Sequence, residues 1–163
     1  MLHKREYETY ERKGVEKPRC YYIPFGDNQE FSFLHGIPDM AKSNRYISLD
    51  GEWLFKAHDD ISDVQVDEEL SDKIPVPGCV QMYGYDQIQY INTRYPFPVD
   101  PPYIRVKNPT FHYRRKFEIT DFTQKYYLNF EGVDSFFYVF INGIGIGYSQ
   151  ISHSTSEWDI SAL

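Results

Sequence analysis

Short stretches in which apolar and polar side chains alternate fill much of the chain after residue 44. In residues 111–119, aromatic and aliphatic side chains occupy alternate positions, interrupted only by Arg115. Successive side chains of a β-strand point to opposite faces, so a period of two predicts a strand with one buried face and one solvated face. Alternation and turn signals predict further strands at 52–57, 125–131 and 144–150, and the beginning of another at 156–160.

Residues 135–141 are apolar on both faces, which predicts a central strand of a sheet. Asn142 and Gly143 follow directly, and this dipeptide favours the tight turn of a β-hairpin. No amphipathic helix of ordinary length is evident between residues 44 and 163. Short strands separated by frequent turn signals are typical of antiparallel sandwiches and barrels, so the sequence predicts an all-β fold.

The first 43 residues lack a sustained hydrophobic period and are interrupted by prolines and glycines. We expect residues 1–43 to form an ordered but irregular strap, with one short helical stretch around 5–12, and residues 44–163 to form the β-domain. The proline-rich segment 74–78 predicts an edge strand or a connection, because proline cannot donate to a central ladder. Residues 59–73 carry many carboxylates without calcium-loop spacing or a partner histidine, so we interpret them as a solvated loop or short helix.

Composition and charge narrow the possible partners. The 163 residues carry a formal net charge of −7, whereas binding to a phosphate backbone requires clustered Lys and Arg, so no nucleic acid partner is expected. The N-terminus shows no apolar signal segment and no run of about 18 apolar residues occurs, so no membrane partner is expected and a cytoplasmic location is the default. Cys20 and Cys79 fit neither a disulfide framework nor a zinc motif, and we expect both to be reduced.

Aromatic residues make up 18% of the chain, and the segment 81–102 interleaves aromatic rings with prolines. Such a segment either packs on the sheet or serves a site, such as a surface on which sugars stack. Nucleophile motifs are absent and the five histidines show no metal-ligand spacing, so no metal ligand is assigned. His153 is singled out because it lies in a polar run after a buried strand. The alternative is a loop rich in Ser and Thr that caps the sandwich.

Three blocks of sequence stand in order between residues 21 and 163. The first is SLDGEWLF at 48–55, and the second contains VPGCVQMYGYD at 76–86 and YINTRYPFPVDPP at 90–102. The third begins with Asn-Pro-Thr at 108–110 and continues with FEGVDSF at 130–136, NG at 142–143, GYSQ at 147–150 and SEWDIS at 156–161. Together they resemble the N-terminal domain of the large cytoplasmic β-galactosidases of glycoside hydrolase family 2. The resemblance implies a jelly-roll β-sandwich of the galactose-binding-domain-like type.

The resemblance also implies what the rest of such an enzyme supplies. The family's catalytic glutamates lie in a TIM-barrel domain beyond the matching segment, so this chain alone is expected to hold no catalytic residue and to be inactive. The expected partners are that barrel in the remainder of the parent chain, a β-galactoside substrate and further copies in a homo-oligomer. The family's domain continues with more strands, so we expect a C-terminally incomplete jelly roll with an open sheet edge.

Few site residues carry over from the family. Its Asn-Pro-Thr motif matches Asn108, whose amide is thereby expected to contact substrate; the alternative is a turn-setting role before Pro109. The family uses magnesium and sodium in its catalytic region, and an aspartate that helps hold the sodium corresponds to Ile151, whose alkyl chain cannot bind a hard cation. Ser152 and His153 are nearby candidates to replace it. No cofactor is expected on this chain itself.

Three functions follow as hypotheses. The first is the non-catalytic N-terminal domain of a β-galactosidase that hydrolyses terminal β-D-galactosyl residues, for example in lactose, and that uses this domain for a substrate-pocket loop and for assembly. The second is a free-standing carbohydrate-binding module. The third is a structural complementation fragment that oligomerises through its open edge without binding sugar. The stacking platform of the second would consist of four tyrosines: Tyr83, Tyr85, Tyr90 and Tyr95.

Overall fold

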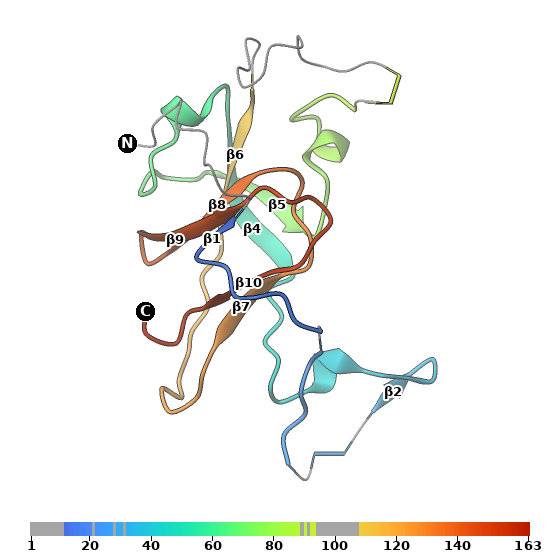
Figure 1. The fold of residues 1–163 in the computed structure, drawn as a ribbon. Coiled ribbons are helices and arrows are strands. Elements are labelled where there is room, and N and C mark those ends of the chain that lie inside the picture. Colours follow the sequence, from blue (N-terminus) through green and yellow to red (C-terminus); the bar gives the residue numbers. More distant parts are fainter. Residues whose placement is uncertain are drawn as a thin grey trace. The chain divides into compact units, whose positions relative to one another are not determined.

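The structure, a computed structural model, describes residues 12–20, 22–27, 29–30, 32–88, 90, 92–93 and 108–163. The chain divides into two compact units, one formed by Lys17–Asp50 and the other by Met1–Glu16 together with Gly51–Leu163. The regular elements of the described residues are β-strands and short 3₁₀-helices, without an α-helix (Figure 1). The all-β prediction is confirmed. Within this part of the chain, no helix is long and apolar enough to cross a membrane.

Strand β4 (Gly51–His58) forms the middle of a three-stranded antiparallel sheet, between β5 (Asp72–Val76) and β6 (Thr110–Arg114). β4 confirms the strand predicted from alternation at 52–57. β5 confirms the prediction of a proline-containing edge strand, because it pairs with β4 on one side only in the described sheet. Strand β6 is shorter than predicted from the pattern over 111–119, since its pairing with β4 ends at Arg114.

Strand β6 ends early because the residues that follow it belong to another core. The Nη1 of Arg115 donates to the carbonyl of Glu52 at 2.5 Å, so a side chain takes the place of continued backbone pairing. Tyr113 in β6 packs in the core of this sheet, whereas Phe117 and Ile119 pack in a second cluster. One apolar period in the sequence is therefore divided between two cores.

A second sheet contains β1 (Arg12–Lys13), β9 (Ile144–Ser149) and β8 (Phe137–Ile141), in that order. Strands β8 and β9 form the predicted hairpin. Asn142 and Gly143 have φ of 51° and 81°, as a two-residue turn with both centres in the left-handed region requires. The prediction of a central strand at 135–141 is wrong, because β9 lies in the middle of the described sheet and pairs with β1 along its other edge.

The remaining elements complete the described chain. Strand β10 (Ser156–Asp159) pairs antiparallel with β7 (Tyr127–Phe130), close to the strands predicted at 156–160 and 125–131. The 3₁₀-helices η2 (Ile61–Asp63) and η3 (Val80–Tyr83) precede and follow β5. In the Lys17–Asp50 unit, the short strands β2 and β3 form a hairpin that is followed by η1; their bounds are Phe33–Leu34, Ile37–Pro38 and Met40–Lys42.

Polar side chains hold the irregular backbone of the Lys17–Asp50 unit. The side-chain oxygen of Asn44 accepts from the N–H of Gly26 at 3.0 Å, and the N–H of Asn44 donates to Oε1 of Gln29 at 3.0 Å. The predicted boundary between residues 43 and 44 lies inside this unit, and the division into 1–43 and 44–163 stays a prediction. The helical stretch expected at 5–12 lies outside the described residues except for Arg12, which is in β1.

Two hydrophobic clusters form the core of the larger unit. One contains the buried Phe55, Ile74 and Val80 with aromatic rings packed around them. The other is centred on Trp158, whose indole N–H donates to the carbonyl of Lys13 at 3.4 Å and so fixes β1. The clusters account for most of the buried aromatic residues. Both cysteines, Cys20 and Cys79, are free and exposed.

Candidate functional site

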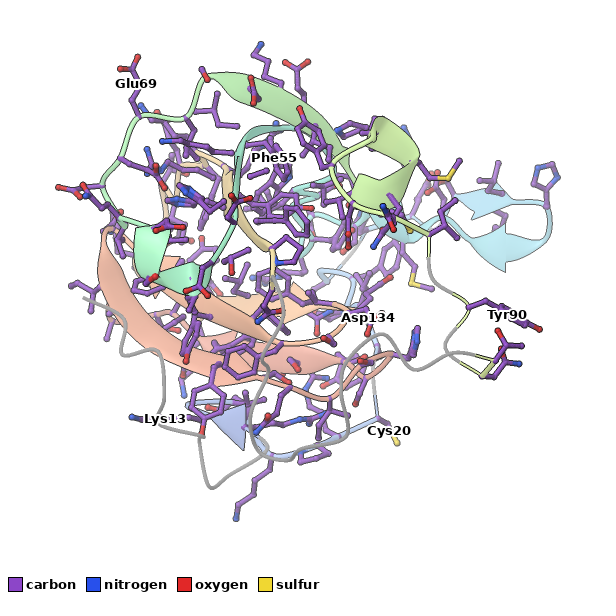
Figure 2. All side chains as sticks on the ribbon, turned by 90° about the horizontal axis from the view of Figure 1, so that it is seen from above. Lys13, Cys20, Phe55, Glu69, Tyr90 and Asp134 are labelled. Carbon is purple, nitrogen blue, oxygen red and sulfur yellow. The ribbon has the colours of Figure 1, made fainter. Side chains whose placement is uncertain are left out.

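The pairing of β4 with β6 places two histidines on one face of the sheet. Lys56 lies opposite His112 in the register of this pair, and His58 follows two positions further along β4. Because side chains alternate between the two faces of a strand, Lys56, His58 and His112 share one face. The neighbouring Phe55 points to the other face, into the core, where Figure 2 shows it on β4 among densely packed side chains.

Glu68 reaches the histidine face from the segment between β4 and β5. Its Oε1 lies 2.7 Å from Nε2 of His58 and 2.9 Å from Nδ1 of His112. Its other oxygen, Oε2, accepts a hydrogen bond from Nζ of Lys56 at 2.5 Å. The side chains of His58, Glu68 and His112 are only 8%, 9% and 14% exposed. We call these three residues the His58–Glu68–His112 cluster.

The segment that carries Glu68 is attached to the same face of the sheet by a second contact. Nη2 of Arg114 donates to the carbonyl of Val66 at 2.8 Å. Arg114 stands two positions after His112 in β6, so both side chains lie on one face. Leu70, two residues after Glu68, is buried. The segment is therefore folded onto the sheet around Glu68 and is not a solvated loop along its whole length.

The surroundings of Glu68 keep its carboxylate charged. Burial alone would raise the pKa of Glu68, because burial penalises the ionised form. Hydrogen bonds from Lys56 and His112, together with the charge and hydrogen bond of His58, outweigh burial and lower the pKa to about 2. The cluster therefore presents an ionised oxygen to two imidazole rings at neutral pH.

The prediction that residues 59–73 lack a partner histidine is wrong, since Glu68 contacts two. The ligand atoms of His58, Glu68 and His112 all lie within 4.8 Å of one another, the one such group of three among the described residues. No short motif reveals the cluster, because its members come from a strand, a loop and a second strand. The register of β4 against β6 is the signal that could have found it.

Asn108 lies immediately before β6 and is exposed. Its carbonyl accepts a hydrogen bond from Oγ1 of Thr110 at 3.5 Å, and Thr110 pairs with His58 in the register. Asn108 therefore stands at the same end of the β4–β6 pair as His58. The expectation that its amide contacts a sugar stays a prediction.

Ser152 and His153 form a turn after β9. Oγ of Ser152 donates to Oδ1 of Asp134 at 2.5 Å, and His153 is exposed with a φ of 56°. Nearby, the buried hydroxyls of Ser149 and Ser156 are hydrogen-bonded at 3.1 Å. These bonds suit the alternative in which the polar run closes one end of the sandwich. A role of Ser152 or His153 in binding stays a prediction.

The side chain at position 151 does not fit the sodium ligand that the family resemblance implies. The side chain of Ile151 supplies no oxygen ligand, and the hydroxyl of Ser152 donates its hydrogen to Asp134. A hard cation needs several oxygen ligands. The magnesium and sodium of the catalytic region therefore stay predictions about other parts of an enzyme.

Three of the four tyrosines predicted as a stacking platform are described. Tyr85 is half-buried with its ring centroid 4.6 Å from that of Phe55, so it packs on the core. Tyr83 and Tyr90 are 48% and 70% exposed. Tyr95, within 94–107, lies outside the described residues. The described part of this platform thus consists of two exposed rings.

Comparison with known proteins decides the family. The family described as glycosyl hydrolases family 2, sugar binding domain, matches residues 46–163. The chain belongs to this family. The resemblance seen in the three sequence blocks is confirmed, and the antiparallel sheets are consistent with a sugar-binding β-sandwich of glycosyl hydrolase family 2.

Similar proteins include several bacterial β-galactosidases. A β-galactosidase of Staphylococcus xylosus is 42% identical over 172 residues, covering 99% of this chain and 16% of that protein. A β-galactosidase of Actinobacillus pleuropneumoniae is 40% identical over 87% of this chain, and one of Pseudoalteromonas haloplanktis is 41% identical over 71%. The family 2 chain therefore spans about a sixth or less of the length of these relatives, and it is homologous to their N-terminal part.

Proposed function

We propose that this chain is the non-catalytic N-terminal domain of a β-galactosidase, which hydrolyses terminal β-D-galactosyl residues such as that of lactose. The observation that carries the proposal is the 42% identity to the Staphylococcus xylosus β-galactosidase across 99% of this chain. Because the match covers 16% of that protein, the proposal assigns hydrolysis to a TIM-barrel domain that holds the two catalytic carboxylates. The chain alone is then inactive.

Exposed apolar side chains in and after η3 suit a contact with such a catalytic domain. Met82, Ile88 and Tyr90 are largely exposed and lie close together in the sequence. Single exposed apolar residues are ordinary, whereas a contiguous apolar patch marks an interaction surface. We assign this stretch to the contact with the catalytic domain of the parent chain.

The proposal gives Asn108 a place in the substrate pocket. An amide offers both a donor and an acceptor, which suits recognition of adjacent sugar hydroxyls. Its exposed position directly before β6 leaves Asn108 accessible to a partner domain. In this account Asn108 binds substrate and takes no part in bond cleavage.

A chimeric enzyme tests the proposed function. This chain would replace the matching N-terminal segment of the Staphylococcus xylosus β-galactosidase, and hydrolysis of a chromogenic galactoside would be measured. Turnover is expected, because the chain supplies the missing domain. A folded chimera without turnover would contradict the domain assignment.

The same chimera separates the role of Asn108 from that of the domain. Asn108→Ala is expected to raise KM by roughly two- to tenfold, the equivalent of one lost hydrogen bond of about 0.5–1.5 kcal/mol. Gln65→Ala is the matched control, because Gln65 is another exposed amide and lies in the segment that carries Glu68. An unchanged KM in Asn108→Ala would refute the role of Asn108 and leave the domain assignment standing.

The second candidate function, a free-standing carbohydrate-binding module, is favoured by the exposed rings of Tyr83 and Tyr90. Calorimetric titration of the isolated chain with lactose distinguishes the two candidates. A non-catalytic domain without its partner is expected to bind lactose weakly or not at all. Tight binding that Tyr90→Ala abolishes would favour the module.

A further inference from the structure

The His58–Glu68–His112 cluster brings three metal-ligand atoms together at a largely buried point of the β5–β4–β6 sheet. We propose that it binds a divalent transition-metal ion of the zinc class through Nε2 of His58, one oxygen of Glu68 and Nδ1 of His112. Imidazole nitrogen and carboxylate oxygen suit zinc, and three protein ligands leave the fourth tetrahedral position to water. The inference goes beyond the sugar-related role and does not rest on it.

Two of the three ligand-atom distances in the cluster are close to those of an occupied site, and all three ligand atoms lie within 4.8 Å of one another. Zinc bonds of about 2.0–2.1 Å at tetrahedral angles would separate neighbouring ligand atoms by about 3.3 Å. Oε1 of Glu68 lies 2.7 Å and 2.9 Å from the two ring nitrogens. An ion therefore requires the two contacts of Glu68 to open by about 0.5 Å, while the two ring nitrogens, which lie within 4.8 Å of each other, must reach the same separation.

The surrounding structure fixes the ligands before an ion arrives. The backbone ladder of β4 and β6 holds the two histidines on one face, and Arg114 ties the segment of Glu68 to that face through the carbonyl of Val66. Lys56 occupies Oε2 of Glu68 and leaves Oε1 for the metal. Partners of this kind orient metal ligands, and their loss weakens metal binding.

The competing explanation is a hydrogen-bonded network without metal. In such a network, both ring nitrogens carry hydrogens and donate them to Oε1 of Glu68. A metal ion needs the same two nitrogens without hydrogens. The two explanations therefore differ in what occupies Nε2 of His58 and Nδ1 of His112 when zinc is supplied.

Zinc titration of the metal-free full chain by calorimetry tests the proposal. One zinc ion per chain is expected to bind. His112→Gln and Glu68→Gln are each expected to weaken zinc affinity by at least about tenfold, because loss of even an indirect partner of a metal ligand costs about 10–100-fold. Circular dichroism of each variant verifies that it is folded.

Matched variants exclude adventitious binding at other residues. His35→Gln removes an exposed histidine outside the cluster and is expected to leave zinc affinity unchanged. The double variant Cys20→Ser with Cys79→Ser removes the two exposed thiols and is also expected to bind zinc normally. If the unaltered chain binds zinc no more tightly than the folded His112→Gln variant, the proposal is wrong.

A measurement on the unaltered chain keeps the test decisive if cluster variants unfold. Zinc is expected to shift the ¹⁵N resonances of Nε2 of His58 and Nδ1 of His112, the two nitrogens nearest to Glu68. The ring resonances of His35 should stay in place. Ring nitrogens of His58 and His112 that do not respond to saturating zinc would overturn the proposal.

Discussion

At the scale of single residues, Gly147 decides how closely β1 and β9 approach. A Cβ atom at this position would lie 2.0 Å from the carbonyl oxygen of Lys13 and 2.7 Å from Nε1 of Trp158. Neither neighbour yields easily, because one is backbone of the paired strand and the other belongs to a fully buried indole. Close packing of strands therefore accounts for the glycine at this position.

We predict that Gly147→Ala lowers the free energy of unfolding by about 1–3 kcal/mol, since an added methyl group overpacks this contact. Urea denaturation measures the change. Gly132→Ala is the matched control, because a Cβ there would meet the backbone of His153 at an ordinary 3.6 Å. Equal losses in the two variants would contradict this explanation of Gly147.

The pKa of the Asp159 carboxyl group is lowered by a residue only two positions further along the chain. Hydrogen bonds from the hydroxyl and then the backbone N–H of Ser161 lower the pKa of Asp159. A carboxyl group whose pKa is lower in the folded than in the unfolded state stabilises the fold above its unfolded pKa. This stabilisation disappears as the pH falls through the folded pKa.

Ser161→Ala is therefore expected to raise the pKa of Asp159 toward its ordinary value and to reduce the loss of stability in acid. NMR titration of the side-chain carboxyl carbon of Asp159 measures the shift. Lys125→Met serves as the comparison, because the charge of Lys125 is the last of the contributions that lower this pKa. A larger rise in Lys125→Met than in Ser161→Ala would refute the assignment to Ser161.

At the scale of elements, the strands could be predicted from the sequence more fully than their pairing. Alternation and the Asn-Gly turn anticipate β4 and the β8–β9 hairpin, because both signals are local. The end of β6 depends on Arg115 bonding to the carbonyl of Glu52, a contact across two strands. The central position of β9 in the described sheet depends on its pairing with β1, whose residues Arg12–Lys13 show no periodic pattern.

Arg114 is expected to control the mobility of the segment that carries Glu68. Arg114→Leu removes the hydrogen bond to the carbonyl of Val66. Amide hydrogen exchange in residues 64–70 should then become about tenfold faster or more, because a hydrogen bond to a charged group contributes about 1.5–3 kcal/mol. Exchange in β8 and β9 should not change. Arg115→Leu is the control, since Arg115 bonds to Glu52 instead. Unchanged exchange in 64–70 would contradict this role of Arg114.

At the scale of the whole molecule, family membership could be predicted and the histidine cluster could not. The three blocks that carry the resemblance are continuous in the sequence, so they are visible without a structure, and the match over residues 46–163 confirms them. The cluster requires the register of β4 against β6 and the return of a loop to the same face. Neither the register nor the return of the loop can be predicted from a single continuous segment of the sequence.

In the proposed function, this chain is one part of a β-galactosidase. The similar β-galactosidases support this proposal, because the chain matches only 16% or less of their length. Most of their length therefore has no counterpart in these 163 residues. A domain of this kind contributes binding surface, while cleavage needs the two carboxylates of another domain. Hydrolysis should therefore depend on the presence of both parts.

Recombination of the two parts measures this dependence most directly. The chain would be added in increasing amounts to a Staphylococcus xylosus β-galactosidase that lacks its matching N-terminal segment, and hydrolysis of a chromogenic galactoside would be followed. No turnover is expected from either part alone, and activity is expected to rise as the chain is added and to saturate at one chain per truncated subunit. Turnover by the chain alone, or no turnover at any ratio of folded components, would contradict the proposed function.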